Sequence, residues 1–117
     1  TANAIFLYTK GLLYQKSDQY NKAIRAYERS VKADPGRIEA YSNIAACYYN
    51  MAVMIEENAR NISDMSMYRE EKVKSDAARE SALVWYEKAY EKDPGNQNIR
   101  EQIKRLYQFL GKEAQDY

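Results

Sequence analysis

Apolar residues recur at every third or fourth position along most of the chain, which is the spacing of one face of an α-helix. The clearest stripe lies in the middle of the chain and consists of Tyr41, Ile44, Ala45, Tyr48, Met51, Ala52 and Ile55. Polar breaks and turn residues divide the pattern into five segments. The sequence therefore predicts an all-α protein with helices over roughly residues 3–16, 19–33, 37–59, 64–92 and 97–110.

The chain repeats itself around its two prolines. They stand in matching phrases, Asp34-Pro35-Gly36 and Asp93-Pro94-Gly95, each preceded by an amphipathic run. Proline cannot continue a helix and glycine adopts turn conformations closed to other residues, so each phrase predicts a helix end. The same shift along the chain aligns further residues of the same kind: Ala23 with Ala82, Ile24 with Leu83, Tyr27 with Tyr86, and Glu28 with Glu87.

This pattern resembles the tetratricopeptide repeat (TPR), whose consensus is Trp-x2-Leu-Gly-x2-Tyr, then Ala-x3-Phe, then Pro. Two units and a final half-unit match it in turn: Leu7, Gly11, Tyr14, Ala23, Tyr27 and Pro35; then Tyr41, Ala45, Tyr48, Ala82, Tyr86 and Pro94; then Arg100, Ile103, Lys104 and Tyr107. The resemblance implies a right-handed helical solenoid in one domain, residues 1–117. Its parts are repeat 1 at about 4–37, an elongated repeat 2 at about 38–96, and a capping helix at about 97–111.

Small residues at fixed positions of these units predict where helices approach closely. Gly11, Ala23, Ala45 and Ala82 leave room for large neighbours, and the repeat places such neighbours beside them: Tyr14, Tyr27, Tyr48 and Tyr86. These tyrosines are therefore expected in the core. Most of the 12 tyrosines in the chain occupy repeat positions of this kind.

The second unit is longer than an ordinary TPR. A standard unit has 34 residues, so the spacing of the two Pro phrases leaves about 25 extra residues between Tyr48 and Ala82. This stretch contains no Pro or Gly, which predicts longer helices rather than a loop. The turn is expected at 61–64, with Ser63 or Asp64 capping the returning helix. The face of that helix that packs against the first helix of the hairpin is expected to consist of Val73, Ala77, Ala78, Ala82 and Tyr86.

Such an elongated hairpin, followed by the final Ile103-Lys104-Arg105-Leu106-Tyr107 helix, is similar to the C-terminal repeats of a group of bacterial TPR proteins. The chain has no starting Met, so we interpret it as a piece of a longer protein. Its compartment stays open: cytoplasmic, or periplasmic if the missing part carries a signal peptide.

Composition excludes several functions. Eighteen basic residues against 17 acidic ones give a net charge of +1, which favours neither nucleic acid nor an anionic membrane as a partner. No apolar run approaches the roughly 20 residues that a membrane-spanning helix needs, so no membrane insertion is expected. The chain has no histidine, which removes the commonest general base and metal ligand. The single cysteine, Cys47, lies between core positions and is expected to be an inert buried thiol. The sequence predicts no enzyme activity, no cofactor and no metal.

The TPR resemblance implies a partner-binding surface on the concave side, which the first helix of each unit lines. At matching repeat positions this surface should consist of Ile5, Tyr8, Leu12, Gln15, Ser42, Asn43, Ala46, Tyr49, Asn50 and Arg105. Tyr8 and Tyr49 are the residues expected to stack on a peptide or hydrogen-bond to it.

One well-known TPR site, the carboxylate clamp for acidic chaperone tails, is poorly matched. Asn43 stands at its middle Asn position, but Tyr8 and Leu12 replace the first Lys and Asn. Asn98 and Gln102 replace the Lys and Arg of the third helix. The sequence thus disfavours a chaperone-tail adaptor.

Two hypotheses remain. In the first, the chain is a non-catalytic scaffold that binds a protein or peptide segment on the concave surface. In the second, it is the capping end of a longer solenoid and forms a homo-oligomer through an exposed surface on its long hairpin: Met51, Met54, Ile62, Met67 and Tyr68.

Overall fold

The computed structural model describes residues 1–113, which form five helices and no strand. They are α1 (Ala2–Lys16), α2 (Tyr20–Ala33), α3 (Ile38–Ala59), α4 (Met65–Lys92) and α5 (Gln97–Phe109). The predicted all-α class is confirmed, and each predicted helix end lies within one residue of the observed end. Residues 114–117 of the predicted domain lie outside the described residues. No helix of residues 1–113 has the length and apolarity required to span a membrane.

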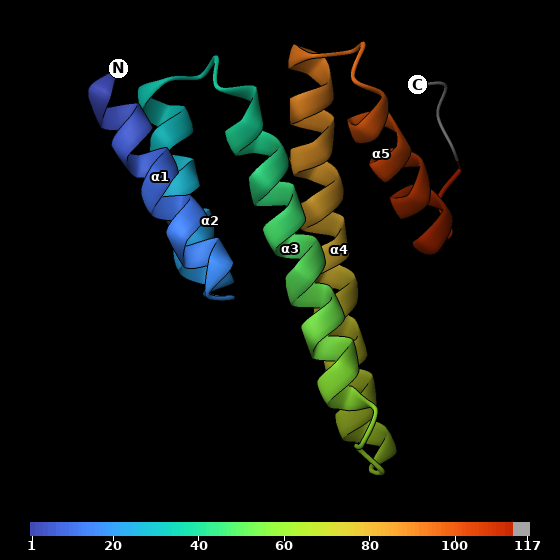
Figure 1. The fold of residues 1–117 in the computed structure, drawn as a ribbon. Helices are drawn as coiled ribbons and strands as arrows, with labels where there is room; N and C mark the ends of the chain where they lie inside the picture. The colour runs from blue at the N-terminus through green and yellow to red at the C-terminus, as the bar shows by residue number, and fades with distance from the viewer. Residues whose placement is uncertain (114–117) are drawn as a thin grey trace.

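The helices form a TPR-type solenoid of two antiparallel pairs and a final helix. Figure 1 shows α1 with α2 and α3 with α4 as neighbouring pairs, with α5 on the far side of α4. The α3–α4 hairpin projects well beyond the end of the α1–α2 pair (Figure 1). The longest dimension of the described chain is 49 Å.

Close approach of α1 and α2 depends on Gly11. A Cβ atom placed on Gly11 would lie 2.5 Å from Cε1 of Tyr27, inside van der Waals contact. The Tyr27 ring is fully buried, and its hydroxyl donates to Gln15 Oε1 at 2.6 Å. The ring is therefore held in place in the space that a larger residue would fill, as the repeat pattern predicts.

Two core clusters continue this packing along the solenoid. The first joins α2 to α3 through Ala23, Ile24, Tyr27, Ala40, Ile44 and Cys47. The second joins α3, α4 and α5 through Tyr41, Ala45, Ala82, Leu83, Tyr86, Ala89, Ile99, Ile103, Leu106 and Tyr107. The small residues Ala45 and Ala82 again stand beside tyrosines, so each repeat buries its apolar face against the next.

The two Asp-Pro-Gly turns do not use the left-handed backbone conformation that glycine favours. Gly36 and Gly95 do not have a positive φ; among residues 1–113 only Asp18 and Gly111 do, at 60° and 68°. The expectation that both Pro-Gly phrases need a glycine conformation is therefore wrong. In the first phrase, Asp34 Oδ1 accepts from the backbone N–H of Gly36 at 3.2 Å, so the acidic side chain supports the turn.

The hairpin takes its extra length unequally, since α3 has 22 residues and α4 has 28, against 15 for α1 and 14 for α2. Asp64 caps α4 as predicted, its side chain accepting from Met67 N at 2.9 Å. The predicted inward positions Val73 and Ala77 are wrong: both are exposed.

The seam of α4 instead follows Ser75, Ala78, Arg79, Ala82 and Tyr86, at helical spacings of three and four. Val73 precedes Ser75 by two positions, which is about 200° around a helix of 3.6 residues per turn, so it faces away. Sequence reasoning chose Val73 because it is apolar. The structure shows that polar residues occupy the seam there.

Gly11→Ala tests the close approach of α1 and α2. Alanine is the better helix former by about 1 kcal/mol, whereas overpacking a fixed ring costs about 1–3 kcal/mol. Because the Tyr27 ring is fully buried and its hydroxyl is bonded to Gln15, we expect an overpacking cost of about 2–3 kcal/mol. The net loss of unfolding free energy is then about 1–2 kcal/mol, measured in urea titrations followed by circular dichroism. Gly95→Ala is the matched control, since a Cβ there meets nothing within 4 Å. Gly11→Ala as stable as the original chain would contradict this packing.

The outer hairpin should be the least protected helical region. From Arg60 to Glu70 every residue except Ile62 is exposed, so little buried surface offsets the entropy of ordering that segment. We expect fast amide hydrogen exchange over about 58–72 and slow exchange around Tyr48 and Tyr86, measured by mass spectrometry. Equal protection along the whole hairpin would argue against this view.

Candidate partner-binding surface

The residues predicted for partner binding lie on the first helix of each pair and on the final helix. They are Ile5, Tyr8, Leu12 and Gln15 on α1, Ser42, Asn43, Ala46, Tyr49 and Asn50 on α3, and Arg105 on α5. Ile5 and Arg105 are exposed, and the others are half-buried. Together they define what is called here the concave surface.

A hydrogen bond ties the α1 and α3 parts of this surface together. Asn43 Nδ2 donates to the hydroxyl oxygen of Tyr8 at 3.1 Å. The Tyr8 ring packs against Tyr27, with centroids 5.6 Å apart, and the Arg37 guanidinium carbon lies 5.0 Å from the Tyr8 centroid. Three neighbours therefore hold Tyr8: one on α2, one on α3 and one just before α3. Sequence reasoning missed Arg37, which precedes α3 and has no repeat counterpart of its own type.

Two of the predicted residues serve the interior of the repeat. Gln15 Oε1 accepts a hydrogen bond from the Tyr27 hydroxyl. Burial raises the pKa of Tyr27, so this hydroxyl stays protonated and remains a donor. Leu12 packs against the core cluster between α2 and α3. The candidates for contact with a partner are therefore centred on Tyr8, Ser42, Asn43, Tyr49 and Asn50, all half-buried.

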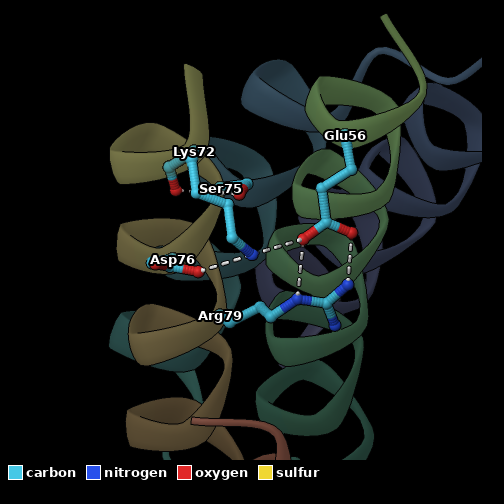
Figure 2. A network of polar contacts seen from close by, with 5 residues as sticks. All are labelled: Glu56, Lys72, Ser75, Asp76 and Arg79. Atoms are coloured by element: carbon cyan, nitrogen blue, oxygen red, sulfur yellow. Dashed lines mark hydrogen bonds and ion pairs between the residues drawn. The ribbon is translucent and has the colours of Figure 1, made fainter. Parts of the chain in front are cut away.

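An ion-pair network inside the hairpin supports Tyr49. Figure 2 shows the Arg79 guanidinium facing the Glu56 carboxylate, with Nη2 to Oε1 at 2.7 Å and Nε to Oε2 at 3.3 Å. The side chain of Arg79 is only 5% exposed. Its guanidinium carbon lies 4.9 Å from the Tyr49 ring centroid. A bidentate pair with half-buried Glu56 therefore fixes the guanidinium against which Tyr49 rests.

Lys72 extends this network toward solvent. Its Nζ lies 3.9 Å from Glu56 Oε2 and 3.4 Å from Asp76 Oδ1 (Figure 2). The hydrogen bond from Arg79 holds the pKa of Glu56 below its ordinary value, helped by the charges of Arg79 and Lys72. Glu56 is therefore ionised at neutral pH. The sequence pattern gave no signal for this pair, because its members stand far apart and each has other oppositely charged neighbours along the chain.

The end of α5 rests on the same part of the hairpin. The Phe109 ring lies 3.9 Å from the Arg79 guanidinium carbon and 5.3 Å from Lys72 Nζ, centroid to atom. Lys112 Nζ pairs with Glu80 at 3.3 Å. Arg105 precedes Phe109 by one helical turn, so it lies on the side of α5 that faces this region.

The clamp position that matches is already occupied. The amide of Asn43 donates to Tyr8, the residue standing where a clamp would have its first Lys. Asn98 and Gln102, at the positions of the third-helix cations, are uncharged. The geometry therefore offers no pair of cations around Asn43 for a terminal carboxylate.

Cys47 has the properties expected of a structural thiol. It is fully buried in the core between α2 and α3, and burial raises its pKa to about 12. The thiolate, which is the nucleophile, is therefore negligible near neutral pH.

Glu56→Gln tests the network. The substitution leaves the buried Arg79 charge without its counterion, so we expect a loss of about 1–3 kcal/mol of unfolding free energy near neutral pH. Because the folded pKa of Glu56 is lowered from 4.5, its contribution is complete above pH 4.5 and is lost as the pH falls through the folded pKa. The difference between the two chains should shrink in that range, measured by urea titration at several pH values.

Glu57→Gln is the control for that experiment, since Glu57 neighbours Glu56 but is exposed. It should change stability little at any pH. Equal losses in both variants would show that the pair with Arg79 contributes nothing specific.

Comparison with known proteins identifies one repeat by sequence and the whole arrangement by fold. The tetratricopeptide repeat family model matches residues 4–37. A TPR repeats protein from Bacteroides fragilis superposes with a TM-score of 0.82 at 21% identity, covering 91% of this chain and 49% of that one.

Curated relatives come from plants. The chain is 30% identical over 112 residues to Hsp70-Hsp90 organizing protein 2 of Arabidopsis thaliana, covering 88% of this chain and 20% of that protein. It is 28% identical over 112 residues to Hsp70-Hsp90 organizing protein 1 of Glycine max, with coverage of 88% and 20%. The chain thus spans about a fifth of the length of these relatives. Residues 4–37 form a tetratricopeptide repeat, and the chain with its five helices is a protein of the TPR fold.

Proposed function

We propose that this chain is a non-catalytic interaction module that binds a segment of another protein on its concave surface. The observation that carries the proposal is the Asn43 to Tyr8 hydrogen bond, which joins α1 and α3 in the middle of that surface. It leaves aromatic and amide groups half-exposed on a rigid support. Such a surface loses little side-chain freedom when a partner binds.

The chemistry of the surface favours a neutral or mixed segment. Tyr8 and Tyr49 are amphipathic anchors with few rotatable bonds, and the Asn50 amide can pair with a backbone N–H or C=O. Ser42 and Ala46 are small and leave room for a partner side chain. Arg105 is the one cation among the predicted residues.

The named relatives support the class of function and not the binding mode. Proteins called Hsp70-Hsp90 organizing proteins are similar to most of this chain, which favours a role in holding other proteins. We propose that the partner here is not gripped by a terminal carboxylate, because Tyr8, Leu12, Asn98 and Gln102 stand at four clamp positions. An internal segment of a partner fits this surface better.

Ser42→Arg with Asn50→Arg tests the concave surface. Peptides selected from a random displayed library on the unmodified chain should lose at least about tenfold in affinity for the double variant, because two long side chains would block α3. Asn21→Arg, exposed on α2, is the control and should bind normally. Isothermal titration calorimetry measures the affinity of each selected peptide for the three chains. Repeating it with a free and with an amidated C-terminus tests whether a terminal carboxylate is required.

Equal affinity for the free and amidated forms is expected where no clamp operates. Peptides that all require a free C-terminus would contradict the proposed mode. Selected peptides whose affinity falls only in Asn21→Arg would contradict the proposed surface.

Self-association through the hairpin is a second candidate, favoured by exposed apolar side chains near its tip. Met65 is 62% exposed, Met67 56% and Tyr68 41%. Met51 and Ile62, which the sequence added to this surface, are half-buried. Sedimentation velocity over a range of concentrations distinguishes the candidates: a dimer that Met67→Glu dissociates would favour the hairpin role.

A further inference from the structure

A second groove lies between α2 and α4, away from the concave surface. It has a volume of about 580 Å³ and is lined by Arg25, Glu28, Arg29, Val31, Lys32, Pro35, Tyr41 and Trp85. Its apolar floor is a pair of rings, Tyr41 and Trp85, with centroids 6.1 Å apart. Its α2 wall carries three cations. None of the residues discussed for the concave surface lines it.

Two lysines of α4 lie over the rings that form the floor of this groove, although neither lines it. Lys88 Nζ lies 4.1 Å from the Trp85 ring centroid, and Lys92 Nζ lies 5.2 Å from that of Tyr41. Both lysines are exposed, as are Arg25, Arg29 and Lys32. The α2 wall of the groove is therefore cationic, and two further cations stand over the rings of its floor.

These five cations lack acidic partners within residues 1–113. The ion pairs of that region lie on the hairpin or join Lys112 to Glu80, and none includes the five. Glu28 is the acid among the lining residues. The lining of the groove therefore carries three cations against one carboxylate, an excess of positive charge that the chain's net charge of +1 does not reveal.

We propose that the α2–α4 groove binds an acidic segment of a partner protein, with carboxylates against the α2 cations and an apolar side chain against Trp85 and Val31. Charge complementarity selects the occupant: alternating acidic and apolar residues match a cationic wall and an apolar floor. The segment needs internal carboxylates and no free C-terminus.

Single-stranded nucleic acid fits the groove less well. Sequence-tolerant binding of bases requires several open aromatic faces in a row, but Tyr41 is only 8% exposed, which leaves Trp85 as the available ring among the lining residues. A carboxylate segment can approach Lys88 and Lys92 without moving them from the rings.

Trp85 is the only tryptophan of the chain, so its emission reports on this groove. The probe is an acetylated and amidated octapeptide, Glu-Glu-Leu-Glu-Glu-Leu-Glu-Glu, and its partner probe has Gln in place of each Glu. We expect a saturable change in Trp85 emission with the Glu peptide, an affinity that falls as salt is added, and no saturation with the Gln peptide.

Arg25→Gln with Arg29→Gln removes two cations without touching the ring contacts, and should weaken the Glu peptide about tenfold. Lys16→Gln with Lys104→Gln makes the same change of net charge at exposed sites on α1 and α5, and should leave its affinity nearly unchanged. The Ser42→Arg with Asn50→Arg chain should also bind normally, which separates this groove from the concave surface. Circular dichroism checks that each variant is folded.

Four outcomes would overturn the proposal. They are equal binding of the Gln peptide, equal weakening by the α1 and α5 control, tighter binding of a dodecamer of thymidylate than of the Glu peptide, and a concentration-dependent dimer that Arg25→Gln with Arg29→Gln dissociates. The third would assign the groove to nucleic acid and the fourth to a second copy of the chain.

Discussion

The close contact between Gly11 and Tyr27 is the constraint on which the candidate surface depends. Because Gly11 has no side chain, the Tyr27 ring fits against the backbone of α1, and its hydroxyl then reaches Gln15. Tyr8 packs on the same Tyr27 ring, and its hydroxyl oxygen accepts a hydrogen bond from Asn43. Because Gly11 lacks a Cβ, Tyr27 can pack close to α1 and support the Tyr8 ring. Tyr8 is then placed to accept the hydrogen bond from Asn43 that joins α1 to α3.

The elongated hairpin follows a different principle from the rest of the solenoid. Where the base of the hairpin has Ala45 against Ala82 and their tyrosine neighbours, its middle has Arg79 with Glu56. Burying the Arg79 charge and half-burying Glu56 cost free energy that their bidentate contact largely offsets, so the pair adds little net stability over apolar residues. Its consequence is geometric: Arg79 can meet Glu56, Tyr49 and Phe109 together only in one register of α3, α4 and α5.

Sequence periodicity predicted the helices well and the polar contacts poorly. The apolar stripe and the Asp-Pro-Gly phrases specify local structure, so they located each helix end. Repeat matching also found Gly11 and Tyr27, because small and large residues alternate there at fixed spacing. It assigned Val73 to the seam and overlooked Arg79, since inward orientation there depends on a partner 23 residues away rather than on side-chain polarity. For the same reason Gln15 was counted as open to a partner, although it bonds within the repeat.

The α2–α4 groove was missed because charges on a helix face are ordinarily solvated, and the net charge conceals their distribution. Residues 1–33 contain six basic and two acidic residues, so the remaining chain is acidic. A solenoid exposes both of its faces, which lets one chain carry two surfaces of different chemistry. Screening limits such fields to about 8–10 Å at physiological salt. The cations of α2 can therefore attract a charged segment only near the groove, and in the proposed concave mode the aromatic and amide groups would recognise a segment by contact rather than by charge.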